Sequence, residues 1–144
     1  LHIMLRFDLE RALMSGDLSV HDLEAAWNDR FLSGFGYAVD KPSNGCLQDV
    51  HWSVGLFGYF PTYSLGNVYA GCLHETLRTA IPELDGQLAA GDTSHATEWL
   101  EDNVLQYCGL RNPKDTIVHA SNVEPTPEPL LVYLEAKFSD LYDL

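Results

Sequence analysis

The chain has 144 residues, of which 46% are hydrophobic, and it carries a formal net charge of −13 at pH 7. A chain of this length usually forms one domain and buries about two-thirds of the surface that it exposes when unfolded. The negative charge would repel a phosphate backbone or an anionic membrane, so we expect no nucleic acid and no membrane as partners. No apolar run approaches the roughly 20 residues that a membrane span requires.

Cysteine usage bounds the redox environment. Cys46, Cys72 and Cys108 are scattered along the chain and form no C-x-x-C pair. This distribution argues against both a zinc ribbon and a disulfide framework. We therefore expect reduced, buried thiols in a cytoplasmic protein.

The first predicted helix covers residues 1–16. Its apolar side chains recur at helical spacing, and Gly16 is expected to end it. These apolar positions are Leu1, Met4, Leu5, Leu9, Ala12 and Leu13. Because the chain starts within this pattern and without an initiator Met, we expect it to be cut from a longer sequence.

A second and a third helix follow. Ser19 and Asp22 resemble a capping box at the start of the second, which Gly34 and Gly36 are expected to break. A glycine-rich polar segment then runs to Phe60. Pro61 suits the first turn of the third helix, which Ile81-Pro82 ends. The apolar face of the second helix is Leu23, Trp27 and Phe31, and that of the third is Leu65, Val68, Tyr69, Cys72, Leu73 and Leu77.

The rest of the chain continues as helices. We predict them at residues 82–90, 93–108 and 113–120, and a closing helix after the prolines of PTPEP. The inward residues are Trp99, Leu100, Val104 and Leu105 in the second of these, and Leu130, Leu131, Leu134 and Phe138 in the last. No alternating strand pattern of useful length occurs. The fold class is therefore all-α, a single helical domain with one glycine-rich irregular segment.

The first helix carries one polar stripe. His2, Arg6 and Glu10 lie four residues apart and share a face of an otherwise apolar helix. The stripe is either an internal salt-bridge ladder or a solvent-facing edge, or else Arg6 points into a cavity. In the last case its planar guanidinium would bind a carboxylate with two parallel hydrogen bonds.

Residues 45–67, GCLQDVHWSVGLFGYFPTYSLGN, mix polar groups, glycines and large aromatic rings. The polar side chains there are Gln48, Asp49, His51 and Trp52, and they either satisfy a buried loop or form part of a site. In a site, His51 would donate a hydrogen bond or a proton to a reacting group. Tyr59 and Tyr63 are phenols that can stabilise developing negative charge.

These motifs together resemble a known family. HIMLRFDLE and the segment at residues 45–67 are similar to the H-I-x-x-R-F, G-x-x-Q-D-x-H-W and Y-F-P-T-Y-x-L-G-N motifs of the thermostable carboxypeptidase 1 family, the M32 metallocarboxypeptidases. LSVHDLEAAWNDRF and EPTPEPLLVYLEAKFSDLY also resemble segments of that family. The resemblance covers essentially the whole chain.

The resemblance implies a helical, cytoplasmic, usually homodimeric metalloenzyme that releases single residues from peptide C-termini with zinc or a similar divalent metal. In the family, an H-E-x-x-H motif and a distant Glu hold the metal, and all three ligands precede the H-I-x-x-R-F motif. Residues 1–144 would then be the C-terminal part of the catalytic domain, the C-terminal half of a larger helical peptidase fold. The metal-binding N-terminal part would be absent, and the isolated fragment inactive.

The resemblance also implies roles for individual residues. Arg6 would bind the terminal carboxylate of the peptide substrate, while His51 with Tyr59 or Tyr63 would stabilise the oxyanion. The residues expected to hold this site in shape are His2, Glu10, Gln48, Asp49 and Trp52.

No metal site is expected within the chain itself. HETLR at residues 74–78 opens with His-Glu but has Arg78 where a second ligand would stand, so we interpret it as an ordinary helix turn. The histidines have no ligand-like spacing either, so we expect no high-affinity zinc in the isolated chain; they are His2, His21, His51, His74, His95 and His119.

Two further expectations concern assembly and the alternative function. The apolar circumference of the first helix predicts a homo-oligomer in solution. A non-catalytic helical module for peptide binding or dimerisation is the alternative to a peptidase. Sequence immediately before Leu1 would decide between them, because H-E-x-x-H there makes the parent an enzyme.

Overall fold

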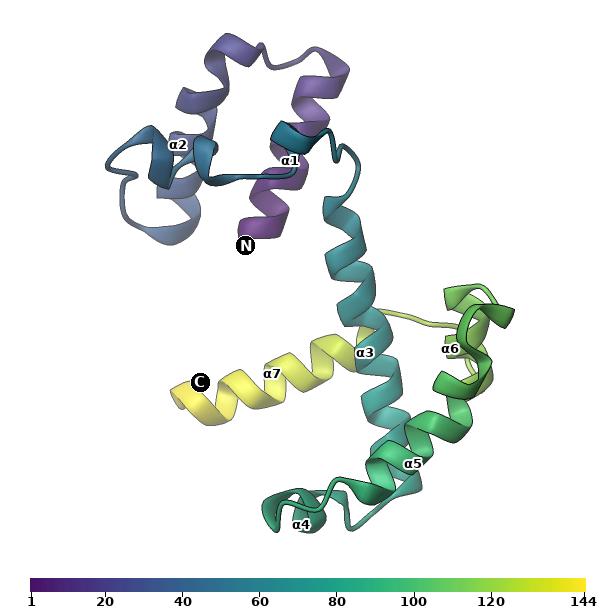
Figure 1. Ribbon diagram of the computed structural model, residues 1–144. Coiled ribbons are helices and arrows are strands. Elements are labelled where there is room, and N and C mark those ends of the chain that lie inside the picture. Colours follow the sequence, from purple (N-terminus) through teal and green to yellow (C-terminus); the bar gives the residue numbers. More distant parts are fainter. The chain divides into compact units, whose positions relative to one another are not determined.

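The computed structural model describes residues 1–144 except for the side chain of Cys108. Over these residues the chain forms seven α-helices and five short 3₁₀ turns, with no strand, so the all-α prediction is confirmed (Figure 1). The helices are α1 (His2–Ser15), α2 (Leu23–Phe35), α3 (Phe60–Ala80), α4 (Leu84–Ala89), α5 (Ser94–Asn103), α6 (Pro113–Ser121) and α7 (Glu128–Tyr142). The 3₁₀ turns are η1 (Val20–Asp22), η2 (Pro42–Asn44), η3 (Cys46–Gln48), η4 (Trp52–Val54) and η5 (Leu105–Leu110).

The contacts within the chain divide it into two compact units. The N-terminal unit is Leu1–Ser64, and the C-terminal unit is Leu65–Leu144. Helix α3 begins in the first unit and continues into the second. Two compact units can belong to one domain of a longer protein. The prediction that residues 1–144 form part of a single domain therefore stays a prediction.

The N-terminal unit consists of α1, α2, the irregular segment and the first turn of α3. As predicted, α1 ends at Gly16, whose φ of 81° is accessible to glycine without strain. Helix α2 continues through Gly34 and ends at Gly36, with a φ of 78°. The core lies between the two helices and the irregular segment, and it consists of Leu5, Leu9, Trp27, Phe31 and Cys46.

The entry to α2 differs from the predicted capping box. Residues Val20–Asp22 form a 3₁₀ turn before the helix, and no side chain caps the helical N–H groups. Ser19 Oγ instead donates a hydrogen bond to Asp22 Oδ2 at 2.9 Å. The short acidic side chain therefore satisfies the serine hydroxyl and leaves the backbone donors of the first turn without a side-chain acceptor.

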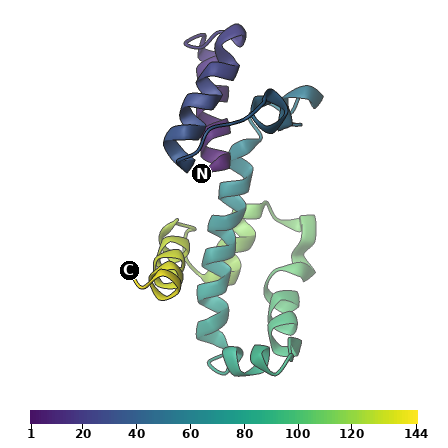
Figure 2. The same ribbon diagram turned by 90° about the vertical axis from the view of Figure 1, so that its left-hand side faces the viewer.

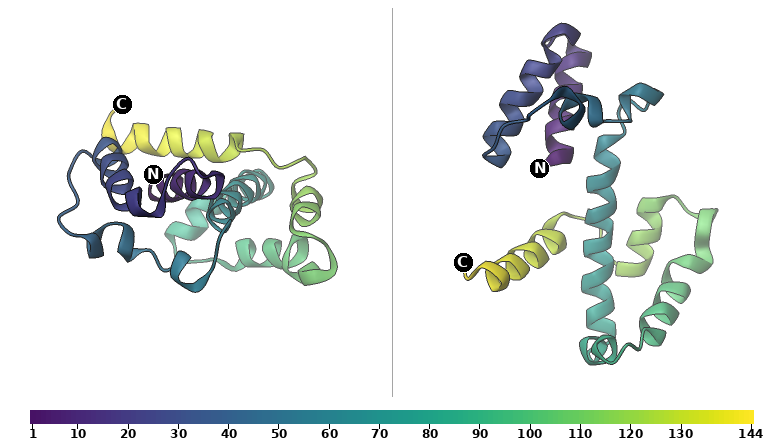
Figure 3. Two further views of the ribbon diagram at one scale, coloured as in Figure 1. Left: turned by 90° about the horizontal axis from the view of Figure 1, so that it is seen from above. Right: turned by 60° about the vertical axis from the view of Figure 1, so that its left-hand side comes forward.

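In the C-terminal unit, α3 has α7 on one side and α5 and α6 on the other (Figures 1 and 3). Helix α4 follows the end of α3, and α5 then runs back alongside it (Figure 2). Helix α3 and the start of α7 approach closely at Gly71. A Cβ atom placed there would lie 2.8 Å from the backbone nitrogen of Leu130, so only glycine fits.

Two predictions in the C-terminal unit need correction. The helix expected over residues 93–108 ends at Asn103 and continues as the 3₁₀ turn η5, because Val104 leaves helical geometry. Four leucine and phenylalanine side chains that were expected to be buried are exposed: Leu65 (48%), Leu105 (56%), Leu131 (53%) and Phe138 (44%). Helical spacing placed each of these residues on the apolar face of its predicted helix, but the packing of the unit leaves them exposed.

The structure also bears on the predictions about the cysteines and about a membrane span. Cys46 and Cys72 are free and buried, as expected, whereas the side chain of Cys108 lies outside the described residues. Burial, followed by the nearby Glu24 charge, raises the pKa of the Cys46 thiol. Among the described residues, no helix is both long enough and apolar enough to cross a membrane.

Candidate functional site

The polar residues of α1 and those of the irregular segment meet in the N-terminal unit. Arg6 Nε donates to Asp49 Oδ2, although the two residues are 43 positions apart. Arg6 Nη1 contacts His2 twice, at 3.1 Å from its carbonyl oxygen and 2.8 Å from Nδ1. The Arg6 guanidinium also lies over the Trp27 ring, 4.9 Å from its centroid. The arginine is therefore fixed by three neighbours.

Asp49 is the centre of this network. Its side chain is 1% exposed, and that of Arg6 is 12% exposed. Oδ2 accepts from Arg6, and Oδ1 accepts from the backbone N–H of His51 at 2.9 Å. Burial alone would raise the pKa of Asp49, but the hydrogen bonds from Arg6 and His51 and their positive charges lower it below its ordinary value. Asp49 therefore stays ionised and orients both residues.

His51 connects Asp49 to a tyrosine. Its Nε2 lies 2.8 Å from the hydroxyl oxygen of Tyr63. Nδ1 lies 3.3 Å from Asp49 Oδ1, but this buried nitrogen has no hydrogen-bond partner in the described structure. The side chain of Tyr59 makes ring contacts but no hydrogen bond with the described residues, and its ring centroid lies 5.7 Å from that of His51. The geometry thus pairs His51 with Tyr63 rather than with Tyr59.

Glu10 makes a separate buried contact with the irregular segment. The residue is 5% exposed, and its carboxylate accepts from Trp52 Nε1 at 2.9 Å and from the backbone N–H of Gly58 at 2.7 Å. Glu10 thereby connects α1 to the loop at the first residue of η4 and again at Gly58, after η4 has ended. Its oxygens bond to these groups and not to Arg6, so the polar stripe is neither a continuous ladder nor a solvent-facing edge.

His2 and Gln48 lie at the margin of the network. Burial, and then the positive charges of Arg6 and the N-terminus, lower the pKa of His2, which favours the neutral ring that accepts from Arg6. Gln48 is exposed and donates to the carbonyl oxygen of Asn44 at 3.0 Å. His2 and Gln48 both line a cavity of about 240 Å³, but Arg6 is not among its lining residues.

The structure thus joins His2, Arg6, Asp49, His51 and Tyr63 in one network. A carboxylate that accepts two parallel hydrogen bonds needs two neighbouring guanidinium nitrogens that are both free. Arg6 does not offer such a pair, since Nε and Nη1 already have partners. A parallel pair of hydrogen bonds to another carboxylate, as expected for a free Arg6, would require one of these partners to be displaced. Nη2 forms no hydrogen bond with the described residues and remains available.

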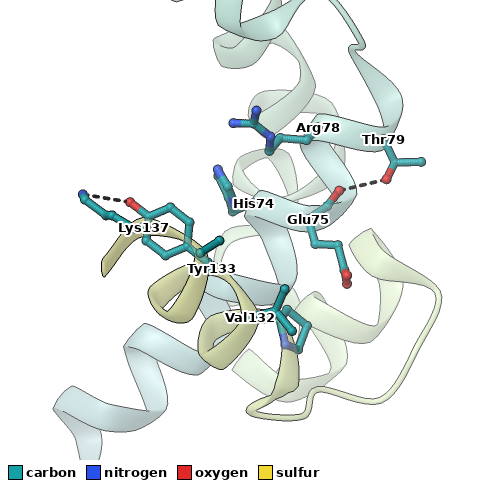
Figure 4. A pocket seen from close by; sticks show the side chains of 9 residues that line it. His74, Glu75, Arg78, Thr79, Val132, Tyr133 and Lys137 are labelled. Carbon is teal, nitrogen blue, oxygen red and sulfur yellow. Dashed lines mark hydrogen bonds between the residues drawn. The ribbon is translucent and has the colours of Figure 1, made fainter. Parts of the chain in front are cut away.

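The HETLR turn lies in α3 of the C-terminal unit. His74 packs edge-on against Tyr133 of α7 with ring centroids 5.1 Å apart, and both line a groove of about 550 Å³ with Arg78 and Lys137. The side chains of His74 and Glu75 extend in different directions (Figure 4). Among the described residues, no group of three or more His, Cys, Asp or Glu side chains is placed to hold a metal ion.

Comparison with known proteins gives a consistent result. The family model of the carboxypeptidase Taq (M32) metallopeptidases matches residues 1–138. Carboxypeptidase 1 of Bacillus subtilis is 37% identical over 142 residues, which is 99% of this chain and 28% of the relative. Thermostable carboxypeptidase 1 of Thermus thermophilus is 36% identical over the same shares.

Solved structures agree with the sequence relatives. The crystal structure of the M32 carboxypeptidase from Deinococcus radiodurans R1 superposes with a TM-score of 0.92 at 34% identity. The match covers 99% of this chain and 29% of that one. The chain therefore spans between a quarter and a third of the length of its relatives, less than the half expected from the motifs.

Proposed function

Because the chain belongs to the carboxypeptidase Taq (M32) metallopeptidase family, we propose that it forms part of a metal-dependent carboxypeptidase that releases single residues from peptide C-termini. Residues 1–144 would be the C-terminal part of its catalytic domain. The match over residues 1–138 carries this proposal. The network of Arg6, Asp49 and His51 supports a role in substrate contacts, since it fixes a permanent cation beside an oriented imidazole.

Arg6 is the proposed ligand of the substrate's terminal carboxylate. Its guanidinium is a planar cationic donor, and the bond to Asp49 and the stacking on Trp27 fix its orientation. Nη2 would supply the hydrogen bonds to the carboxylate, because the other donors of the guanidinium have partners. A preoriented donor loses less side-chain entropy on binding than a free one.

His51 and Tyr63 are the proposed stabilisers of negative charge on the scissile carbonyl oxygen. The 2.8 Å contact between Nε2 and the phenol fixes the two groups relative to one another. With the imidazole N–H at Nε2 donating to the phenol oxygen, the phenolic O–H of Tyr63 is free to serve as the donor to the oxyanion. Tyr59, Trp52 and Glu10 would shape the surrounding loop.

The metal of the family does not fit the residues described here. No three suitable ligands converge among them, and His74 and Glu75 of the HETLR turn diverge. We propose that residues outside this chain hold zinc or a similar divalent ion, and that the isolated chain is inactive. A cytoplasmic homodimer is the proposed form of the parent enzyme.

A chimera tests this function. The chain replaces the matching 28% of Bacillus subtilis carboxypeptidase 1, with which it is 37% identical. We expect metal-dependent release of single C-terminal residues, which falls about 10²- to 10³-fold in His51→Gln. Tyr63→Phe should reduce kcat more than the matched control Tyr59→Phe. A folded chimera that binds peptides without hydrolysing them would instead support the non-catalytic peptide-binding or dimerisation module.

A further inference from the structure

Arg111 in the C-terminal unit has a buried nitrogen without an acceptor. It follows η5, and its guanidinium carbon lies 3.8 Å from the centroid of the Tyr107 ring, in van der Waals contact with the ring face. Its Nη1 is buried and forms no hydrogen bond with the described residues. Burying a charged donor without an acceptor is costly, so such a group indicates a missing anionic partner.

The acidic residues close to Arg111 in sequence have other partners. At the start of α6, Asp115 Oδ2 accepts a hydrogen bond from the side-chain amide of Asn112, and the Asp115 backbone N–H donates the N-cap bond to Asn112 Oδ1 at 3.0 Å. Glu124 pairs with Lys114 at 2.7 Å. Neither carboxylate therefore neutralises Arg111.

A cavity adjoins this arginine. Its volume is about 340 Å³, and it is lined by Arg111 together with Tyr69, Val104, Leu105, Pro113, Thr116 and Ile117. The walls are mostly apolar, and Ile117 and Thr116 are buried. Thr116 Oγ1 donates its proton to the carbonyl oxygen of Asn112, so the threonine hydroxyl can only accept a hydrogen bond from a ligand. A concave apolar cavity with one unpaired cation is typical of a small-molecule site.

We propose that this cavity binds a small carboxylate with an apolar body. The carboxylate pairs with Arg111 Nη1, and the apolar body lies against Val104 and Ile117. The volume is at the lower end of the range for ligand pockets, which favours a ligand of about the size of one amino-acid side chain over a folded peptide segment. Occupation of this cavity requires no peptidase activity and no residue of the N-terminal unit.

Binding in the cavity can be measured from the methyl signals of the isoleucines. There are three, and they separate the possible locations: Ile117 lines the cavity, Ile81 follows α3 in the same unit, and Ile3 belongs to α1. Methyl-labelled isoleucine is titrated with 3-phenylpropionate in the 144-residue chain. We expect a saturable shift of the Ile117 methyl signal alone, with a dissociation constant on the order of 0.1–1 mM.

An uncharged ligand and two arginine variants test whether the charge pairing with Arg111 drives binding. 3-Phenylpropionamide has the same body without the charge and should bind at least tenfold more weakly, as should the acid to Arg111→Gln. Arg78→Gln is the matched control, because Arg78 belongs to the same unit but pairs with Asp85 at the surface. It should leave the affinity unchanged.

Three results overturn the assignment. The first is acid and amide binding equally to the wild-type chain, a comparison that does not depend on the folding of any variant. The second is a shift at Ile3 or Ile81 without one at Ile117. The third is no saturable shift of Ile117 up to 10 mM acid, which would leave the cavity to be covered by another protein segment.

Discussion

The two units of the chain differ in how deeply the carboxylates of their ion pairs and hydrogen bonds are buried. In the N-terminal unit, Glu10 and Asp49 are buried and each of their oxygens accepts a hydrogen bond. In the C-terminal unit, the ion pairs lie at the surface, as in Arg78–Asp85, whose side chains are 45% and 68% exposed. A buried charge requires a partner, whereas an exposed one is stabilised by water. The buried, fully paired carboxylates belong to the unit in which we propose the substrate contacts.

The most completely buried large side chains also lie in the N-terminal unit. Trp27, Phe60 and Leu9 of the N-terminal unit are at most 1% exposed. In the C-terminal unit, Leu131 and Phe138 of α7 are about half exposed, and Leu141 is 61% exposed. The chain covers 28% of the length of its curated relatives. We propose that other parts of the parent enzyme cover the open faces of the C-terminal unit.

Removal of the Asp49 carboxylate should have the largest effect on stability. Asp49→Ala leaves the Arg6 charge buried without its partner, which costs about 3–5 kcal/mol of unfolding free energy. In a Trp99→Phe background, the remaining tryptophans, Trp27 and Trp52, report only the N-terminal unit during urea denaturation. A loss below about 1 kcal/mol would contradict the importance of the buried pair.

The next largest effect on stability is expected where α3 and α7 approach closely. Gly71→Ala places a methyl group against the backbone of Leu130 and should cost about 1–3 kcal/mol. Gly66→Ala in the same helix meets nothing within 4 Å and should instead stabilise by about 0.5–1 kcal/mol. Urea denaturation followed by circular dichroism compares them. Equal stability of the two variants would show that α7 does not pack as described.

The exposed ion pair provides the matched comparison for Asp49. Asp85→Ala removes the partner of Arg78 at the surface and should change the unfolding free energy by less than about 1 kcal/mol. This small difference should vanish in 1 M salt, where exposed charges are screened. A loss as large as that of Asp49→Ala would remove the distinction between the two units.

The smallest effect concerns pH and His2. The pKa of His2 is lowered in the folded chain, so the unfolded chain binds the proton more readily. Stability should therefore fall as pH decreases below the unfolded value of about 6.5 and through the folded pKa. His2→Gln should flatten this part of the profile of unfolding free energy against pH. A profile that keeps the same slope in the variant would exclude His2 as its source.

The sequence predicted the local features of the fold but not the long-range pairings. Gly16 and Pro61 mark helix ends through their own backbone properties, and both predictions were confirmed. The bond between Arg6 and Asp49 joins residues 43 positions apart and depends on how α1 packs against the irregular segment. Helical spacing also grouped Glu10 with Arg6, but the packing of Trp52 gave Glu10 a different partner.

Sequence patterns neither distinguish the two tyrosines nor single out Arg111. Tyr59 and Tyr63 are equivalent by composition, and only their positions around His51 distinguish them. Arg111 carries no motif, and its missing acceptor is visible only from its burial. The capping box expected at Ser19 is not formed, because Ser19 Oγ donates to Asp22 Oδ2 and no side chain accepts from the backbone N–H groups of the first turn.

The role of Arg6 is tested most directly by changing the substrate in the active chimera. Arg6→Lys keeps the charge but loses the planar donor geometry, and Arg6→Ala removes both. With free-acid peptides, we expect Arg6→Ala to lower kcat/KM by about 30- to several thousand-fold, because a desolvated carboxylate loses its partner. Peptides amidated at the C-terminus should be poor substrates for the wild type and scarcely poorer for the variant. An equal loss on free-acid and amidated peptides would contradict carboxylate recognition and leave Arg6 as the structural partner of Asp49.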